Sequence, residues 1–204
     1  MSKTLSDITR VRRRFQRSIR VGDDAGVAEG FICTATAAQA LETTIEHVSA
    51  LGHGAFTWTG PYGCGKSSLA VVLAALLGPT GPSRDEALEV LPAELREQIV
   101  TKMGWEPQGW TTLSIVGSRS DASSVLTSAL DEAGIKKGSG PIERLVAEAK
   151  RGIGTLLVID EMGKLLEHAA SEGGDAFFFQ ELAEAASRSD GHLVVVGVLH
   201  QAFD

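Results

Sequence analysis

Residues 55–78 read AFTWTGPYGCGKSSLAVVLAALLG, and this stretch decides which fold we expect. Its first five residues are small, aromatic or β-branched, as in a short buried strand. Residues 69–77 are all apolar, as in a buried helix, and a glycine-rich loop lies between the two. A strand, a glycine-rich loop and a helix in direct succession form the local architecture of a phosphate-binding loop. The simpler alternative is a glycine-rich turn before a helix.

The loop matches the Walker A pattern through Gly60, Gly65, Lys66 and Ser67. Glycines allow a turn tight enough for successive backbone N–H groups to face phosphate oxygens, and the following helix adds the positive end of its dipole. We expect Lys66 to reach the β- and γ-phosphates and to assist catalysis, and the Ser67 hydroxyl to ligate Mg²⁺. The residues expected to contact the nucleotide are Gly60, Pro61, Tyr62, Gly63, Cys64, Gly65, Lys66, Ser67 and Ser68.

A second motif lies downstream, where residues 156–161 read LLVIDE. An unbroken apolar run of this kind is typical of a strand that is covered on both faces. Ligands of open α/β sheets bind at the carboxyl ends of the strands, so we expect Asp160 and Glu161 to lie beside the phosphate loop. There Asp160 would hold Mg²⁺ through a water molecule, and Glu161 would orient and deprotonate the attacking water. The alternative is an acidic pair that only caps the next helix.

Strand-like and helix-like stretches alternate along the rest of the chain. Such alternation predicts an α/β domain with a mainly parallel sheet and helices on both faces. We expect one domain over residues 34–204, after a basic arm and loop over residues 1–33. The predicted strands are residues 55–59, 110–117, 155–160 and 192–199. One predicted helix begins at residue 34 or 36 and ends at residue 50, and another follows the glycine loop directly. The other predicted helices are residues 83–103, 121–133, 141–151 and 177–187.

Together these motifs resemble the additional-strand P-loop ATPases, a group that includes the AAA+ and STAND proteins. The resemblance covers residues 34–203 and rests on the Walker A loop, the strand that ends in Asp160-Glu161, and a further strand that ends in a polar residue. It implies a three-layer P-loop NTPase fold with the partial strand order 1-4-3-2. The stretches WTGPYGCGKSSLA, LLVIDEMGKLLE and VVVGVLHQAFD also resemble large bacterial P-loop ATPases, including some of anti-phage defence operons.

The resemblance also implies further site residues and ligands. The fourth strand of such proteins usually ends in a polar sensor of the γ-phosphate, and either His200 or Gln201 matches that position. ATP and Mg²⁺ are the implied ligands, and ATP is preferred to GTP because no guanine-reading Asn-Lys-x-Asp pattern occurs. The arginine finger and second sensor of AAA+ proteins normally come later in the chain. We therefore expect a domain truncated at its C-terminal end, part of a longer protein, with weak hydrolysis in isolation.

Three functions fit these motifs to different degrees. The leading hypothesis is an ATPase domain that couples nucleotide binding and hydrolysis to conformational work. Such a domain could act on DNA, within a defence complex or other multiprotein assembly, or as a homo-oligomer. The alternative is a nucleotide-dependent switch or scaffold with little turnover, as in STAND-like proteins. A small-molecule kinase is disfavoured, because such enzymes usually carry an arginine-rich lid and Arg188 is the only arginine between Gly163 and Asp190.

Charge is distributed unevenly over the 204 residues. The net charge of -7 argues against a basic nucleic-acid-binding domain as a whole. The first twenty residues, however, contain seven Lys and Arg residues against a single acid, Asp7. Such an arm could contact nucleic acid, an acidic partner or an anionic membrane, or could simply be solvated. Nucleic acid is the partner that we retain, and no membrane partner is expected.

Cysteine content and hydropathy indicate the compartment. Cys33 and Cys64 form no CxxC pair and no cluster with histidine, which fits a reducing environment without a disulfide framework or metal site. The sequence shows no apolar signal segment and no apolar stretch long enough to span a membrane, so we expect a cytoplasmic location. Cys64 lies inside the glycine loop and could make that site sensitive to oxidation.

Three weaker features have simple explanations. Asp121 follows a predicted strand and is expected to cap the next helix. Lys164 could contact a phosphate or a partner, but a surface lysine is the simpler interpretation. The consecutive phenylalanines at 177–179 cannot all face one core, so we expect one of them to lie at a contact with another subunit or with further sequence.

Overall fold

A computed structural model of the chain describes residue 28 and residues 30–103, 106–171 and 175–200. Nearly all of the predicted basic arm, and Gln201, lie outside these residues. The sheet contains four parallel strands in the order β1-β4-β3-β2, which confirms the predicted α/β class and the strand order 1-4-3-2. The strands are β1 (Ala55–Gly60), β2 (Thr111–Val116), β3 (Thr155–Asp160) and β4 (Leu193–His200).

The register of the strands brings the predicted site residues to one edge of the sheet. Gly60 at the end of β1 pairs with His200 at the end of β4. Val116 at the end of β2 pairs with Asp160 at the end of β3. Because all four strands are parallel, the glycine loop, the acidic pair and the predicted sensor position leave the sheet from the same carboxyl edge.

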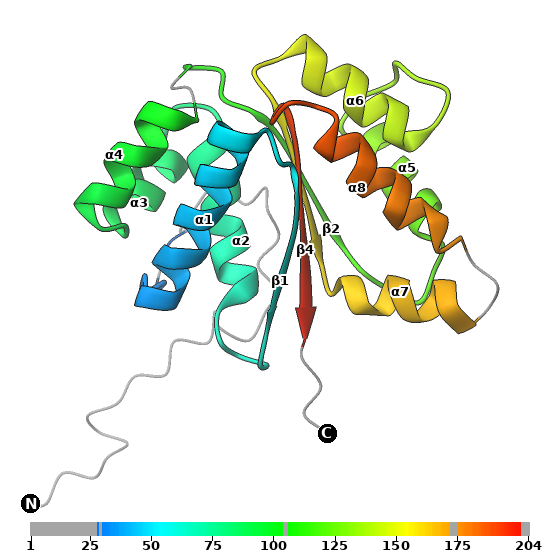
Figure 1. Ribbon diagram of the computed structural model, residues 1–204, viewed down its shortest axis with the longest axis horizontal. Helices are drawn as coiled ribbons and strands as arrows, with labels where there is room; N and C mark the ends of the chain where they lie inside the picture. The colour runs from blue at the N-terminus through cyan, green and yellow to red at the C-terminus, as the bar shows by residue number, and fades with distance from the viewer. Residues whose placement is uncertain (1–27, 29, 104–105, 172–174, 201–204) are drawn as a thin grey trace, which may run out of the picture.

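Helices cover both faces of the sheet, so the domain has three layers (Figure 1). One layer holds α1 and α2 with α3 and α4, and the other holds α5, α6, α7 and α8. The bounds are α1 (Ala35–Leu51), α2 (Lys66–Leu77), α3 (Pro82–Glu89), α4 (Ala93–Lys102), α5 (Ala122–Glu132), α6 (Pro141–Arg151), α7 (Met162–Ser171) and α8 (Phe177–Ser187).

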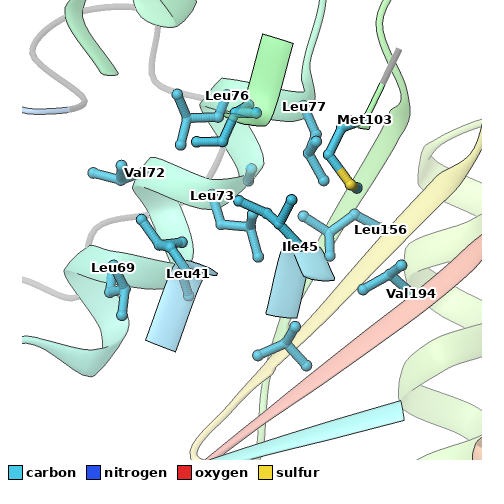
Figure 2. Packing of buried hydrophobic residues seen from close by; sticks show 14 of the residues in the cluster. Leu41, Ile45, Leu69, Val72, Leu73, Leu76, Leu77, Met103, Leu156 and Val194 are labelled. Atoms are coloured by element: carbon cyan, nitrogen blue, oxygen red, sulfur yellow. The ribbon is translucent and has the colours of Figure 1, made fainter. Parts of the chain in front are cut away.

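Strand β3 joins two hydrophobic cores because successive side chains of a strand point to opposite faces. Leu156 packs into the core under α1 and α2, close to Ile45 and Leu73 (Figure 2). Leu157 belongs to the core on the other face, with Leu126 among its members. Burial on both faces explains the continuous apolar run in this strand, and it fixes the end of β3 rigidly where the acidic pair follows.

The helices differ from the prediction in two places. The single helix predicted over 83–103 is instead two helices, α3 and α4, with a break at Leu91-Pro92. Proline cannot donate a backbone hydrogen bond and disfavours helical geometry in the residue before it, while Leu91 is only 3% exposed and anchors the turn in the core. Helix α7 was not predicted; it follows the acidic pair directly and buries Leu165.

The weaker sequence features have clear positions in the fold. Asp121 caps α5, since its side chain accepts a hydrogen bond from the Ser124 backbone at 2.8 Å, as predicted. Phe178 is buried, whereas Phe177 is 72% exposed, so at least one phenylalanine does face outward. Within the described ranges, no helix combines the length and the apolar character that crossing a bilayer requires.

Candidate functional site

The glycine loop leads from β1 directly into the first turn of α2. Gly63 and Gly65 have φ values of 74° and 91°, a region in which a side chain would be strained. A Cβ at either position would meet no atom within 4 Å, so the backbone conformation rather than space requires glycine there. Gly65 is the N-cap of α2 and no side chain caps this helix. The first backbone N–H groups of α2 are therefore available to an anion.

Lys66 is held over this loop by the loop's own carbonyl groups. Its Nζ donates to the Gly60 carbonyl at 2.7 Å and to the Pro61 carbonyl at 2.8 Å, and it lies 3.6 Å from the Cys64 Sγ. The residue is only 9% exposed, and its partners in the described part of the chain are two carbonyl groups and a thiol rather than a carboxylate. A buried ammonium with neutral partners is poorly compensated. The arrangement is suited to an anion bound in the loop.

Ser67 and Asp160, the two predicted metal ligands, are in direct contact. The Ser67 Oγ donates to the Asp160 Oδ1 at 3.1 Å, which links the first turn of α2 to the end of β3. Mg²⁺ prefers oxygen ligands and usually takes only one or two from the protein, with the rest from water and phosphate. No group of three or more His, Cys, Asp and Glu side chains suited to a metal occurs among the described residues. A hydroxyl beside a single carboxylate fits Mg²⁺ that also binds phosphates.

Glu161 follows in a constrained backbone conformation. Its φ of 52° is unusual for a residue with a side chain. The turn packs against the residue after β2: the Gly117 backbone N–H donates to the Asp160 carbonyl at 2.7 Å, and a Cβ on Gly117 would lie 2.3 Å from the Glu161 carbonyl oxygen. On its other side, the Glu161 carbonyl accepts from the Lys164 backbone at 3.0 Å. These contacts fix the direction in which the acidic pair leaves the sheet.

The side chain of Glu161 forms an ion pair with the side chain of Lys164, three residues further along. The hydrogen bond with Glu161 and its charge raise the pKa of Lys164, with smaller electrostatic contributions from Tyr62 and Glu167. The Lys164 side chain is 49% exposed, so it is a surface lysine, but one that contacts a predicted catalytic residue. The spacing of three residues at the start of a helix is the sequence signal for this pair.

The end of β4 meets the tip of the glycine loop. The Tyr62 and His200 rings are stacked, with centroids 3.8 Å apart and an interplanar angle of 8°. The His200 Nδ1 is buried and has no hydrogen-bond partner in the described part of the chain. Of the two sensor candidates, His200 therefore lies beside the loop, while Gln201 is outside the described residues.

The remaining loop residues have simpler environments. Cys64 is exposed, and a Cβ added to Gly60 would lie 3.2 Å from the Cys64 Sγ, so Gly60 leaves room for the sulfur. Ser68 lies half-buried in the first turn of α2. The role of Gly117 could not be predicted, because a single glycine after a strand carries no specific signal.

Comparison with known proteins adds no assignment: no protein-family model matches the sequence, and a search of curated proteins finds no match.

Proposed function

We propose that this chain is a P-loop ATPase domain that binds Mg·ATP in the 60–67 loop and hydrolyses the bond between the β- and γ-phosphates. The observation that carries the proposal is the 3.1 Å contact between the Ser67 Oγ and the Asp160 Oδ1. It joins two motifs that are far apart in the sequence, and it does so beside the anchored ammonium of Lys66. A structural glycine turn would not need an acidic strand end at this place.

The binding roles follow from the groups that face the loop. The backbone N–H groups at the start of α2 would donate to phosphate oxygens, and Lys66 would compensate their charge while its carbonyl contacts keep it in place. Ser67 and Asp160 would hold Mg²⁺, which neutralises charge on the β- and γ-phosphates when bound. None of these roles requires a rearrangement of the sheet.

Glu161 is the residue that we propose as general base. Water would attack the γ-phosphorus as the bond to the β-phosphate oxygen breaks, its proton would pass to the Glu161 carboxylate, and ADP would leave with its electron pair. His200, stacked on Tyr62 at the loop tip, is the described candidate for a group that responds to the γ-phosphate. Gln201 stays the second candidate for that role.

The wider role rests on the resemblance of the motifs alone. We propose an ATPase of the additional-strand group, related to AAA+ or STAND proteins, that acts in the cytoplasm within a homo-oligomer or larger complex. Coupling to DNA or to a defence complex, with the basic arm as a nucleic-acid contact, belongs to the same proposal. A different base preference would leave the phosphate site unchanged, since no described contact concerns the base.

A nucleotide-dependent switch with little turnover is the second candidate. The ion pair between Glu161 and Lys164 favours it, because a carboxylate that is already paired has less capacity to accept a proton from water. The switch and the ATPase share one phosphate site and differ only in the rate of the chemical step.

Steady-state hydrolysis by the wild type and by Glu161→Gln separates these two functions. For the ATPase we expect the variant to bind Mg·ATP normally but to hydrolyse it at least about 100-fold more slowly, because the proton acceptor is lost. Equal and near-zero rates with tight binding would indicate the switch. Rapid hydrolysis by the Gln variant would reject Glu161 as the base.

A further inference from the structure

Four side chains near the glycine loop form two contacting pairs. Tyr62 lies at the loop tip, His200 ends β4, Glu161 follows β3, and Lys164 lies in the first turn of α7. Glu161 forms an ion pair with Lys164, and Tyr62 stacks on His200. The proposed function uses Glu161 and His200 but gives no role to Tyr62 or Lys164.

The ion pair restrains the proposed general base. A carboxylate has a limited number of lone pairs, and those directed at the Lys164 ammonium are not directed at a water molecule. The backbone adds to the restraint, since Glu161 has a φ of 52° and its carbonyl accepts from the Lys164 N–H at 3.0 Å. Both contacts orient Glu161 toward the first turn of α7. The Lys164 side chain is 49% exposed, so the pair can open without unpacking the core.

We propose that Lys164 is a positioning residue that holds Glu161 in an ion pair and so limits how often Glu161 can accept a proton from the attacking water. The inference rests on the proposed function and adds its control step. Hydrolysis then depends on how often the Glu161–Lys164 pair opens.

Replacement of Lys164 by an uncharged residue tests the role of the ion pair directly. In Lys164→Met and Lys164→Gln, Glu161 has no cation to pair with, so we expect kcat for Mg·ATP to rise at least about threefold while KM changes by less than about twofold. Lys164→Arg keeps a cation and should retain the wild-type rate. Glu161→Gln introduced into Lys164→Met should remove the gain, because the gain acts through Glu161.

The matched control is Arg188→Met, which removes an exposed ion pair with Glu184 on α8, away from the loop. We expect no change in kcat.

The outcomes separate this inference from the proposed function. If both neutral variants bind Mg·ATP with wild-type affinity but hydrolyse it at the wild-type rate or more slowly, the inference is overturned and the phosphate site stands. If neither the wild type nor any variant binds Mg·ATP, the proposed function fails, and this inference with it.

Discussion

The Ser67 hydroxyl donates a 3.1 Å hydrogen bond to the Asp160 carboxylate, and this bond joins the first turn of α2 to the end of β3. The Asp160 Oδ1 that accepts it also accepts from the Glu161 backbone N–H at 2.9 Å. One carboxylate oxygen is therefore fixed by two donors, and the acidic pair is oriented relative to the glycine loop before any ligand binds.

Replacement of Ser67 should change the dependence on Mg²⁺. In Ser67→Ala the hydroxyl ligand is lost, so we expect the Mg²⁺ concentration for half-maximal ATP hydrolysis to rise at least about tenfold. Ser67→Thr keeps a hydroxyl and should remain near the wild type. Ser128→Ala removes a helical serine on α5 and serves as the matched control. An unchanged Mg²⁺ titration for Ser67→Ala would exclude Ser67 as a ligand.

Replacement of Gly117 should displace the backbone of the acidic pair. A Cβ there would lie 2.3 Å from the Glu161 carbonyl oxygen, so Gly117→Ala must displace the turn that carries Glu161. We expect kcat to fall at least about tenfold, with a smaller effect on Mg·ATP affinity. Gly140→Ala is the control, because no atom lies within 4 Å of its added Cβ and its φ is −133°. Wild-type kcat in Gly117→Ala would show that the turn does not position Glu161.

The two cysteines should differ in reactivity. Cys64 is exposed in the glycine loop, whereas burial raises the pKa of the half-buried Cys33 and so lowers its thiolate fraction. We expect N-ethylmaleimide to label Cys64 first and to abolish nucleotide binding, and Mg·ATP to slow this labelling. Mass spectrometry of the two peptides measures both rates. Faster labelling of Cys33, or no protection of Cys64 by Mg·ATP, would contradict this placement of the loop.

Asp121 should stabilise the domain in a pH-dependent way. The hydrogen bonds from Ser124 lower the pKa of this carboxylate, so its contribution is present above the ordinary Asp value of about 3.9 and is lost as the pH falls. We expect Asp121→Ala to lower the free energy of unfolding by about 1 kcal/mol at neutral pH. The deficit should shrink below about pH 4. Asp121→Asn keeps the cap without titrating, and urea unfolding at several pH values compares the three proteins.

Much of the fold could be predicted because the decisive signals are local. Each strand is an apolar or β-branched run bounded by turn residues, and all four lie within two residues of their predicted ends. The strand order could not be predicted from such local signals, because the periodicity of a sequence does not indicate which strands pair. It came from the resemblance of the motifs, and the register of β4 between β1 and β3 confirms it.

The break between two short helices and the long-range side-chain contacts could not be predicted from the sequence. The 83–103 stretch is helical on both sides of Leu91-Pro92, so its composition suggested one helix where proline makes two. Spacing could have suggested the pair of Glu161 and Lys164, but nothing in the sequence brings Tyr62 onto His200. That contact depends on the register that places Gly60 opposite His200 at the sheet edge.

The central claim is that the loop of residues 60–67 binds the phosphates of ATP, and calorimetric titration with Mg·ATP tests it most directly. We expect the wild type to bind with a Kd below about 1 mM, and Lys66→Met, which keeps the apolar stem but loses the ammonium, to bind at least about tenfold more weakly. Lys102→Met, at a surface ion pair with Glu46, should bind as the wild type does. No heat from the wild type at millimolar Mg·ATP, or equal affinities for the wild type and Lys66→Met, would contradict the account.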